Sequence, residues 1–319
     1  MGASMVTTPN LAVTAALAEY APSFAKLKWN PVSGGLSGAS VFAGVDSSPR
    51  FALKLFPKQS ANRVHLEAVH RAITVAQPTY LVPELVSARS GVTLVERPAY
   101  FCEIATWVPG EPKRDDSQLR LQNACKALAE LHRVWQRFDS GVAPFPAVAR
   151  RLRILREWRT NYKVAHSPQV NDAERVLSAW IDWAERTLEP LEGNLVDVHP
   201  CLCDVHREHV LFHPFRSTVS GFIDFTAMKI DHPSVDLARY LGNDGNALKV
   251  GLNAYREAGG APTVTADIVT ILDRTGTVAA VAYWLFRKLN EGELPPAGEA
   301  RLIRAVGTLQ MQSHPHLFA

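Results

Sequence analysis

Cysteine is scarce in this sequence, and its few positions are unevenly spaced. Cys102, Cys125, Cys201 and Cys203 are the only four thiols in 319 residues. A disulfide-stabilised secreted domain needs more of them at closer spacing, so we expect a reducing compartment. The first ten residues also lack a basic stretch followed by an apolar run, which argues against a secretory signal and leads us to expect a cytoplasmic protein.

An excess of charge of one sign is missing as well. The chain has 34 Lys and Arg residues against 31 Asp and Glu residues, a formal net charge of +3. Nucleic acids and anionic membranes select concentrated basic patches, so we expect neither as a partner. Long hydrophobic runs are absent too: the longest, residues 278–286, is about half of the roughly 20 residues that a membrane span requires. We expect this run to be a buried helix.

What the sequence does contain is a sheet-like first third followed by helices. Short apolar segments separated by Gly, Ser or Pro are typical of an antiparallel sheet. A helix over 61–75 interrupts them, and a short helix over about 10–20 precedes them. Longer patterns with apolar residues at threes and fours follow residue 110 and predict helices over 117–135, 145–164 and 172–188. The predicted strands cover 27–32, 39–45, 51–56, 85–88, 93–96 and 100–107.

This arrangement predicts an α+β fold with two lobes. Residues 1–107 form an N-terminal lobe of sheet plus one helix, and residues 108–319 form a larger helical lobe. We expect a ligand to bind in the cleft between such lobes.

A glycine-rich segment between the first two predicted strands is the first candidate site. Gly34, Gly35, Ser37 and Gly38 lie in it, and Lys54 follows in the third strand. Glycines let backbone donors approach a polyphosphate, and a strand lysine supplies a point charge. The alternative is a tight turn next to an edge-strand lysine.

The lysine needs an anionic partner, because Leu53 and Leu55 flank it in an apolar strand. Glu67, on the helix that follows, is the candidate. The alternative is that Glu67 pairs with Arg63 or Arg71 at four-residue spacing on a solvated helix face.

The segment 199–213 is the richest in reactive side chains. Asp204 and Asp224, about twenty residues apart, each end a short apolar stretch and could act as a base and a metal ligand in one cleft. They could equally be loop aspartates that cap local backbone. Zinc is a further alternative, because six potential ligands occur between His199 and His213, although Cys201 and Cys203 would point to opposite sides of an extended chain.

Two common signatures are missing: GxxxxGK[ST] and the GxSxG elbow do not occur, which argues against a P-loop enzyme and a serine hydrolase. Seven features nevertheless follow one another in order. They are the glycine-rich segment, Lys54, Glu67, and the segments 107–110, 128–132, 204–212 and 223–225. In this order, over residues 31 to about 243, the chain resembles the aminoglycoside phosphotransferase and choline kinase-like family.

The resemblance implies a bilobal protein-kinase-like fold that passes a phosphoryl group from ATP to a hydroxyl of a small molecule. It implies that Lys54, held by Glu67, contacts the phosphates under the loop of Gly34, Gly35, Ser37 and Gly38. Residues 103–107, Glu103 and Ala105 among them, would line the adenine pocket. Asp204 would be the catalytic base, Asp224 would hold Mg²⁺, and Asp236 would brace the catalytic loop.

Two positions depart from the family pattern. Leu202 and Cys203 stand where His-Gly is common, and His209 stands in place of a metal-binding asparagine. Imidazole prefers softer ions than Mg²⁺, so His209 predicts Mn²⁺ as an alternative metal. It also leaves open a nucleotide-binding pseudokinase without turnover, beside the zinc-binding alternative.

The acceptor is only partly constrained. Residues 226–319 contain nine acidic and nine basic side chains, so this part lacks the acidic field that a polycationic drug would need. Sugars, amino alcohols, nucleosides and antibiotics with few charges stay open, as does the oligomeric state.

Overall fold

A computed structural model of the chain describes residues 9–32, 38–112, 117–161, 168–242 and 244–312. The chain divides into two compact units. Unit 1 comprises residues 1–115 and 207–226, and unit 2 comprises residues 116–206 and 227–319. The sequence placed 207–226 in the helical lobe, whereas in the structure this segment packs with unit 1.

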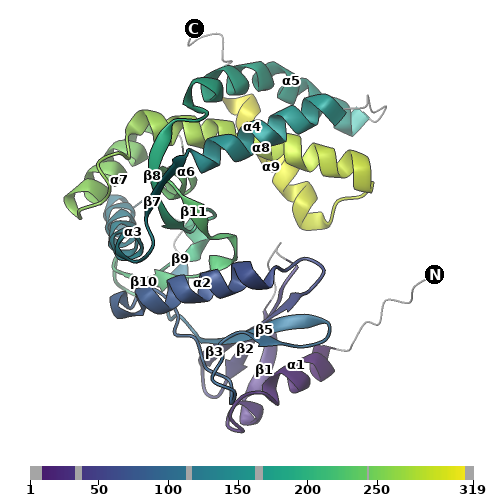
Figure 1. Cartoon of the computed structure of the whole chain (residues 1–319), viewed down its shortest axis with the longest axis vertical. Helices are drawn as coiled ribbons and strands as arrows, with labels where there is room; N and C mark the ends of the chain where they lie inside the picture. Colours follow the sequence, from purple (N-terminus) through teal and green to yellow (C-terminus); the bar gives the residue numbers. More distant parts are fainter. Residues whose placement is uncertain (1–8, 33–37, 113–116, 162–167, 243, 313–319) are drawn as a thin grey trace. The chain divides into compact units, whose positions relative to one another are not determined.

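Unit 1 is built on a five-stranded antiparallel sheet in the order β1-β2-β3-β5-β4. Helices α1 and α2 lie on opposite sides of this sheet (Figure 1). The elements are α1 (Pro9–Leu17), β1 (Lys28–Val32), β2 (Ser40–Val45), β3 (Pro49–Pro57), α2 (Arg63–Ala76), β4 (Val95–Glu96) and β5 (Tyr100–Thr106).

The alternation of side chains along β3 explains the two covered faces. Leu53 and Leu55 point into the core cluster that contains residues of α1, whereas Phe56 packs with Leu66 of α2 on the other face. Lys54 shares the face of Phe56, because the two residues are two positions apart. The sheet therefore presents its lysine on the side that α2 covers.

A small sheet in the order β10-β9-β6 completes unit 1. Gly221 of β10 allows its close packing, because a Cβ there would lie 2.8 Å from Val108 and 3.1 Å from the carbonyl oxygen of Leu81. The backbone N–H of Phe222 donates to that same oxygen at 2.7 Å. This sheet consists of β6 (Glu111–Pro112), β9 (Val210–Phe212) and β10 (Val219–Phe222).

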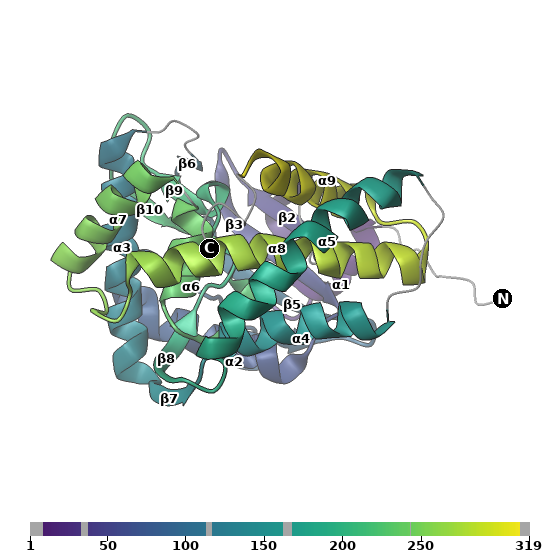
Figure 2. The same ribbon diagram turned by 90° about the horizontal axis from the view of Figure 1, so that it is seen from above.

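Unit 2 is mainly helical. Helix α8 contacts α4, α5, α6 and α9 (Figure 2). It is the one helix of the described residues that is long and apolar enough to cross a membrane, but half of its most apolar window is buried within the structure. The helices are α3 (Gln118–Phe138), α4 (Pro146–Asn161), α5 (Pro168–Leu188), α6 (Ser234–Leu241), α7 (Gly245–Glu257), α8 (Ala266–Glu291) and α9 (Pro296–Met311).

A three-stranded sheet in the order β11-β8-β7 is embedded among these helices. Its strands are β7 (Gly141–Pro144), β8 (Leu195–Cys201) and β11 (Lys229–Asp231). The central strand β8 leads directly into the loop that carries Asp204. Most of the predicted elements are confirmed, but the predicted strand over 85–88 is wrong, since it forms only an isolated bridge from Leu85 to Ala105.

Candidate active site

In unit 1, Lys54 faces a carboxylate on the neighbouring strand. Lys54 of β3 is directly opposite Glu103 of β5 in the antiparallel register. Residues in such a pair have Cβ atoms roughly 5 Å apart and project from the same face. The sheet therefore brings together two residues that are far apart in the sequence.

The ion pair expected between Lys54 and Glu67 is not formed among the described residues, so that prediction is wrong. Glu67 instead accepts a hydrogen bond from Arg63 Nε at 2.8 Å, one helical turn away. Arg63 also contacts Glu96, and this group of charges is largely exposed. The solvated alternative, with Arg63 as the partner, describes Glu67 correctly.

Glu103 is buried and held by a histidine of α2. Its Oε2 accepts a 2.6 Å hydrogen bond from His70 Nε2, and His70 Nδ1 lies 2.8 Å from the hydroxyl of Thr93. Burial alone would raise the pKa of Glu103, but the His70 hydrogen bond and the charge of Lys54 outweigh it and hold that pKa below its ordinary value. Glu103 is therefore an ionised carboxylate inside unit 1.

Asp224 lies within electrostatic reach of this group. Asp224 follows β10 in the chain. Its negative charge acts to raise the pKa of Glu103, although less strongly than His70 and Lys54 lower it. Asp224 adopts a left-handed backbone (φ 63°), and its side chain is 40% exposed. His209 Nε2 is 3.9 Å from Asp224 Oδ2, so the predicted neighbourhood of these two residues is confirmed. Their binding of a metal stays a prediction.

The remaining nucleotide-site predictions fall on two segments. Gly34, Gly35 and Ser37 lie outside the described residues, and Gly38 is exposed with a left-handed φ of 72°. Ala105 of β5 is buried opposite Ala52 of β3. By strand alternation these two small side chains lie on the same face as Lys54 and Glu103.

In unit 2, Asp204 is held by a histidine and an arginine. His206 Nε2 donates to Asp204 Oδ1 at 3.0 Å, and Arg239 donates to the same oxygen through Nε at 3.1 Å and Nη2 at 3.0 Å. Burial alone would raise the pKa of Asp204, but the His206 hydrogen bond and the Arg239 charge hold it far below its ordinary value. Asp204 therefore carries a firmly ionised carboxylate.

Asp236 fixes the backbone that precedes Asp204. This fully buried carboxylate accepts the N–H of Leu202 at 2.8 Å and of Cys203 at 2.6 Å, and His132 Nε2 at 3.0 Å. The expected bracing of the loop is confirmed by these bonds. Cys203 has a left-handed φ of 62°, which explains why glycine suits this position and why the cysteine here is a departure.

The cysteines do not form the predicted alternative zinc site. The one group of possible metal ligands among the described residues consists of His132, Cys201 and Asp236, and Cys203 is not part of it. The Cys201 thiol contacts the carbonyl oxygens of His199 and Asp231, and burial raises its pKa well above the ordinary value. Since Asp236 and His132 are also fully engaged, this group is a hydrogen-bonded core cluster.

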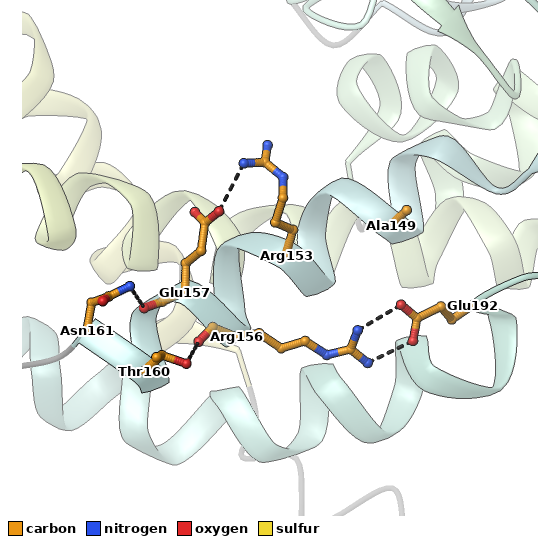
Figure 3. Close-up of a pocket in the computed structure, with 7 residues that line it drawn as sticks. All are labelled: Ala149, Arg153, Arg156, Glu157, Thr160, Asn161 and Glu192. Carbon is orange, nitrogen blue, oxygen red and sulfur yellow. Dashed lines mark hydrogen bonds and ion pairs between the residues drawn. The ribbon is translucent and has the colours of Figure 1, made fainter.

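A hollow of about 360 Å³ on α4 of unit 2 is a weaker candidate site (Figure 3). Its charged side chains pair with one another: Arg156 donates twice to Glu192, at 2.8 and 2.7 Å, and Arg153 pairs with Glu157 at 3.1 Å. Such pairing satisfies the charges without a ligand. The hollow therefore adds nothing to the sites built around Lys54 and Asp204.

A sheet unit with a strand lysine, and a helical unit with a braced aspartate loop, define the class of kinase-like phosphotransferases. Comparison with known proteins agrees. A model of the phosphotransferase enzyme family matches residues 28–266, so the chain belongs to that family. No curated protein sequence matches the chain.

Several solved structures share the protein-kinase-like fold. Amicoumacin kinase in complex with AMP-PNP, Ca²⁺ and the ligand Ami has a TM-score of 0.68 at 13% identity, covering 98% of this chain and 97% of that one. Spectinomycin phosphotransferase with ADP and spectinomycin has a TM-score of 0.66 at 11% identity, with 96% and 95% covered. A microcompartment-associated aminopropanol kinase has a TM-score of 0.65 at 13% identity, with 94% and 95% covered.

Three residues of these sites were not found from the sequence. Ala52 and His70 could have been, since Ala52 is two positions before Lys54 on its strand face and His70 lies on the apolar stripe of α2 with Leu66 and Ile73. Arg239 carries no such signal, because its contact with Asp204 depends on the packing of α6 in unit 2.

Proposed function

We propose that this protein transfers the γ-phosphoryl group of ATP to a hydroxyl group of a small molecule. The observation that carries the proposal is the position of Lys54, which shares one sheet face with an ionised buried carboxylate within electrostatic reach of Asp224. A lysine so placed is a fixed positive charge for a polyphosphate. The family and the nucleotide-bound structures of similar fold support the same reaction.

The nucleotide is proposed to bind along the Lys54 face of the sheet. Ala52 and Ala105 leave room for a flat base because neither extends beyond a methyl group. Lys54 binds phosphate oxygens, beneath the loop of Gly34, Gly35, Ser37 and Gly38. Glu67 has no place in this arrangement, because its carboxylate is engaged with Arg63.

Asp224 and His209 fit a divalent cation by their donor atoms. The half-exposed carboxylate of Asp224 is a hard oxygen donor, and His209 Nε2 lies 3.9 Å from it, so these two side chains would hold a divalent ion together. The imidazole favours Mn²⁺ over Mg²⁺ by the ordinary order of affinities. A bound ion would neutralise charge on the phosphates.

Asp204 is proposed to orient the acceptor hydroxyl. A carboxylate with a strongly lowered pKa is a poor proton acceptor in the ground state but a good hydrogen-bond acceptor. It can therefore aim the hydroxyl oxygen at phosphorus and receive the proton late, as charge develops. His206 and Arg239 keep the carboxylate in place for this step.

ADP release in the presence of a panel of acceptors tests the proposal. The panel comprises sugars, amino alcohols, nucleosides and weakly charged antibiotics, each with Mg²⁺ and with Mn²⁺. We expect ADP release that depends on one acceptor class and is lost in Asp204→Asn. Nucleotide binding without acceptor-dependent release under any condition would instead support a pseudokinase.

The acceptor is proposed to be a small molecule with few charges, since residues 226–319 balance nine acidic against nine basic side chains. Nucleic acids and membranes are not proposed partners, and the scarcity of cysteine favours the cytoplasm.

A further inference from the structure

A strand lysine that binds phosphate needs an anionic side chain to hold it in position. In unit 1 the carboxylate nearest to Lys54 in the sheet register is that of Glu103, on the neighbouring strand. Lys54 and Glu103 are opposite residues of β3 and β5 on one face, and Glu103 is 7% exposed. The ammonium and the carboxylate do not form a direct ion pair within 4.0 Å among the described residues, yet the positive charge of Lys54 helps to lower the pKa of Glu103. The ammonium is therefore attracted without being bound tightly to Glu103.

Helix α2 contributes a histidine instead of a glutamate to this face. His70 is 4% exposed, one turn beyond Glu67, and it lies with Leu66 and Ile73 on the buried side of α2. Glu67 lies at the border of the buried face of α2, where its side chain is partly exposed and pairs with the exposed Arg63. The direction of each side chain follows from its place in the helical turn.

His70 is itself fixed at both ring nitrogens. An ionised carboxylate can only accept, so the Nε2 hydrogen of His70 is donated to Glu103 over 2.6 Å. The other ring nitrogen, Nδ1, lies 2.8 Å from the hydroxyl oxygen of Thr93, within hydrogen-bond distance. Thr93, His70 and Glu103 thus form a chain of hydrogen bonds that prevents the carboxylate from rotating away from Lys54.

We propose that Glu103, oriented by His70, is the residue that positions Lys54 for the nucleotide phosphates, in place of a glutamate on helix α2. This inference rests on the proposed function, since it assigns a positioning residue for that reaction. Glu103 touches neither phosphate nor acceptor in this role. It keeps the ammonium extended along the sheet face, where the phosphates bind.

Two isosteric substitutions provide a matched test. Glu103→Gln and Glu67→Gln each remove one negative charge at constant shape, but only the first changes the environment of Lys54. We expect Glu103→Gln to raise the KM for ATP by roughly tenfold to a hundredfold, with a smaller effect on the KM for the acceptor. The Kd for ADP should rise in parallel. Glu67→Gln should leave both constants within about twofold of the wild type.

A milder variant covers the risk that Glu103→Gln does not fold. Thr93→Val removes only the hydroxyl that steadies His70, and it should raise the KM for ATP by a few-fold in a protein that melts near the wild-type temperature. Equal ATP constants for Glu103→Gln and the wild type, or a larger effect of Glu67→Gln, would overturn the inference while the proposed function stands. A wild-type protein that binds no ADP would overturn both.

Discussion

Replacing Asp236 by asparagine should weaken the fold more than its conservative chemistry suggests. The carboxylate is fully buried and accepts three hydrogen bonds, from Leu202 N, Cys203 N and His132 Nε2. An asparagine side chain replaces one acceptor oxygen by an NH₂ group, so at least one buried N–H would face another donor. The orientation that costs least places the NH₂ against Cys203, because that oxygen accepts only one of the three bonds.

The magnitude follows from these contacts. A buried donor left without an acceptor costs about 1–3 kcal/mol, and a lost hydrogen bond to a charged group adds a further 1.5–3 kcal/mol. We therefore expect Asp236→Asn to lower the free energy of unfolding by about 3–5 kcal/mol, a large fraction of the roughly 5–15 kcal/mol that stabilises a typical domain. Urea unfolding followed by circular dichroism measures this difference.

Asp244→Asn is the matched control. Asp244 also accepts two backbone N–H groups, from Asn246 at 2.9 Å and Ala247 at 3.1 Å, but it is an exposed N-cap of α7. Asparagine caps helices about as well as aspartate, so the control should change stability by less than about 0.5 kcal/mol. Losses for the two variants that agree within about 1 kcal/mol would refute the reasoning from burial.

Four further substitutions test other parts of the site. Asp204→Asn should lower kcat by about 10²–10⁴-fold with an unchanged Kd for ADP, because the acceptor loses its orienting group and the phosphates lose nothing. His209→Asn should shift the ratio of Mn²⁺-supported to Mg²⁺-supported activity towards magnesium, because an amide oxygen is a harder donor than imidazole. Cys203→Gly should raise the melting temperature slightly, since relief of a left-handed backbone worth about 1–2 kcal/mol outweighs the added freedom of the unfolded chain. His232→Asn should make stability less sensitive to acid: burial lowers the pKa of His232 to about 4, so the unfolded chain binds the extra proton and the wild type loses stability as pH falls from 6.5 towards 4, by about 1.4 kcal/mol per pH unit.

Each of these expectations has a result that contradicts it. Near-normal turnover of Asp204→Asn would remove Asp204 from the reaction, and an unchanged metal ratio in His209→Asn would make the histidine structural. A loss of more than about 1 kcal/mol in Cys203→Gly would show that packing of the thiol dominates its backbone strain. Identical urea midpoints for His232→Asn and the wild type, both at pH 7 and at pH 4.5, would mean that the imidazole is not the acid-sensitive group.

The sequence predicted the elements of unit 1 well where a local pattern exists. Short apolar segments separated by Gly, Ser or Pro located β3 and β5, and helical periodicity located α2 within a few residues. Short strands such as β7 and β11 were not predicted, because they pair with β8 over long sequence distances and have little pattern of their own. Local sequence carries no information on such partners.

The site was predictable to the same extent. Lys54, Asp204 and Asp224 stand out by their motifs, whereas the partner of Lys54 depends on the register between β3 and β5, which is set by many contacts at once. Glu67 was misassigned because a nearby arginine at four-residue spacing competes for it, a possibility that the sequence itself raised.

Unit 1 is made of two segments, 1–115 and 207–226, that are separated by residues 116–206 of unit 2, and this separation affects how the chain folds during synthesis. Strand β6 near residue 111 pairs with β9, and Leu81 binds the N–H of Phe222, so these partners are made only after all of residues 116–206. Closing such a loop costs entropy before its contacts can form, and this slows folding. While the ribosome extends unit 2, the five-stranded sheet can therefore form, but β6 and the carbonyl oxygen of Leu81 lack their partners, and a truncated chain that ends near residue 115 would lack them permanently. The segment that brings Asp224 is thus also the one that closes the sheet unit holding Lys54.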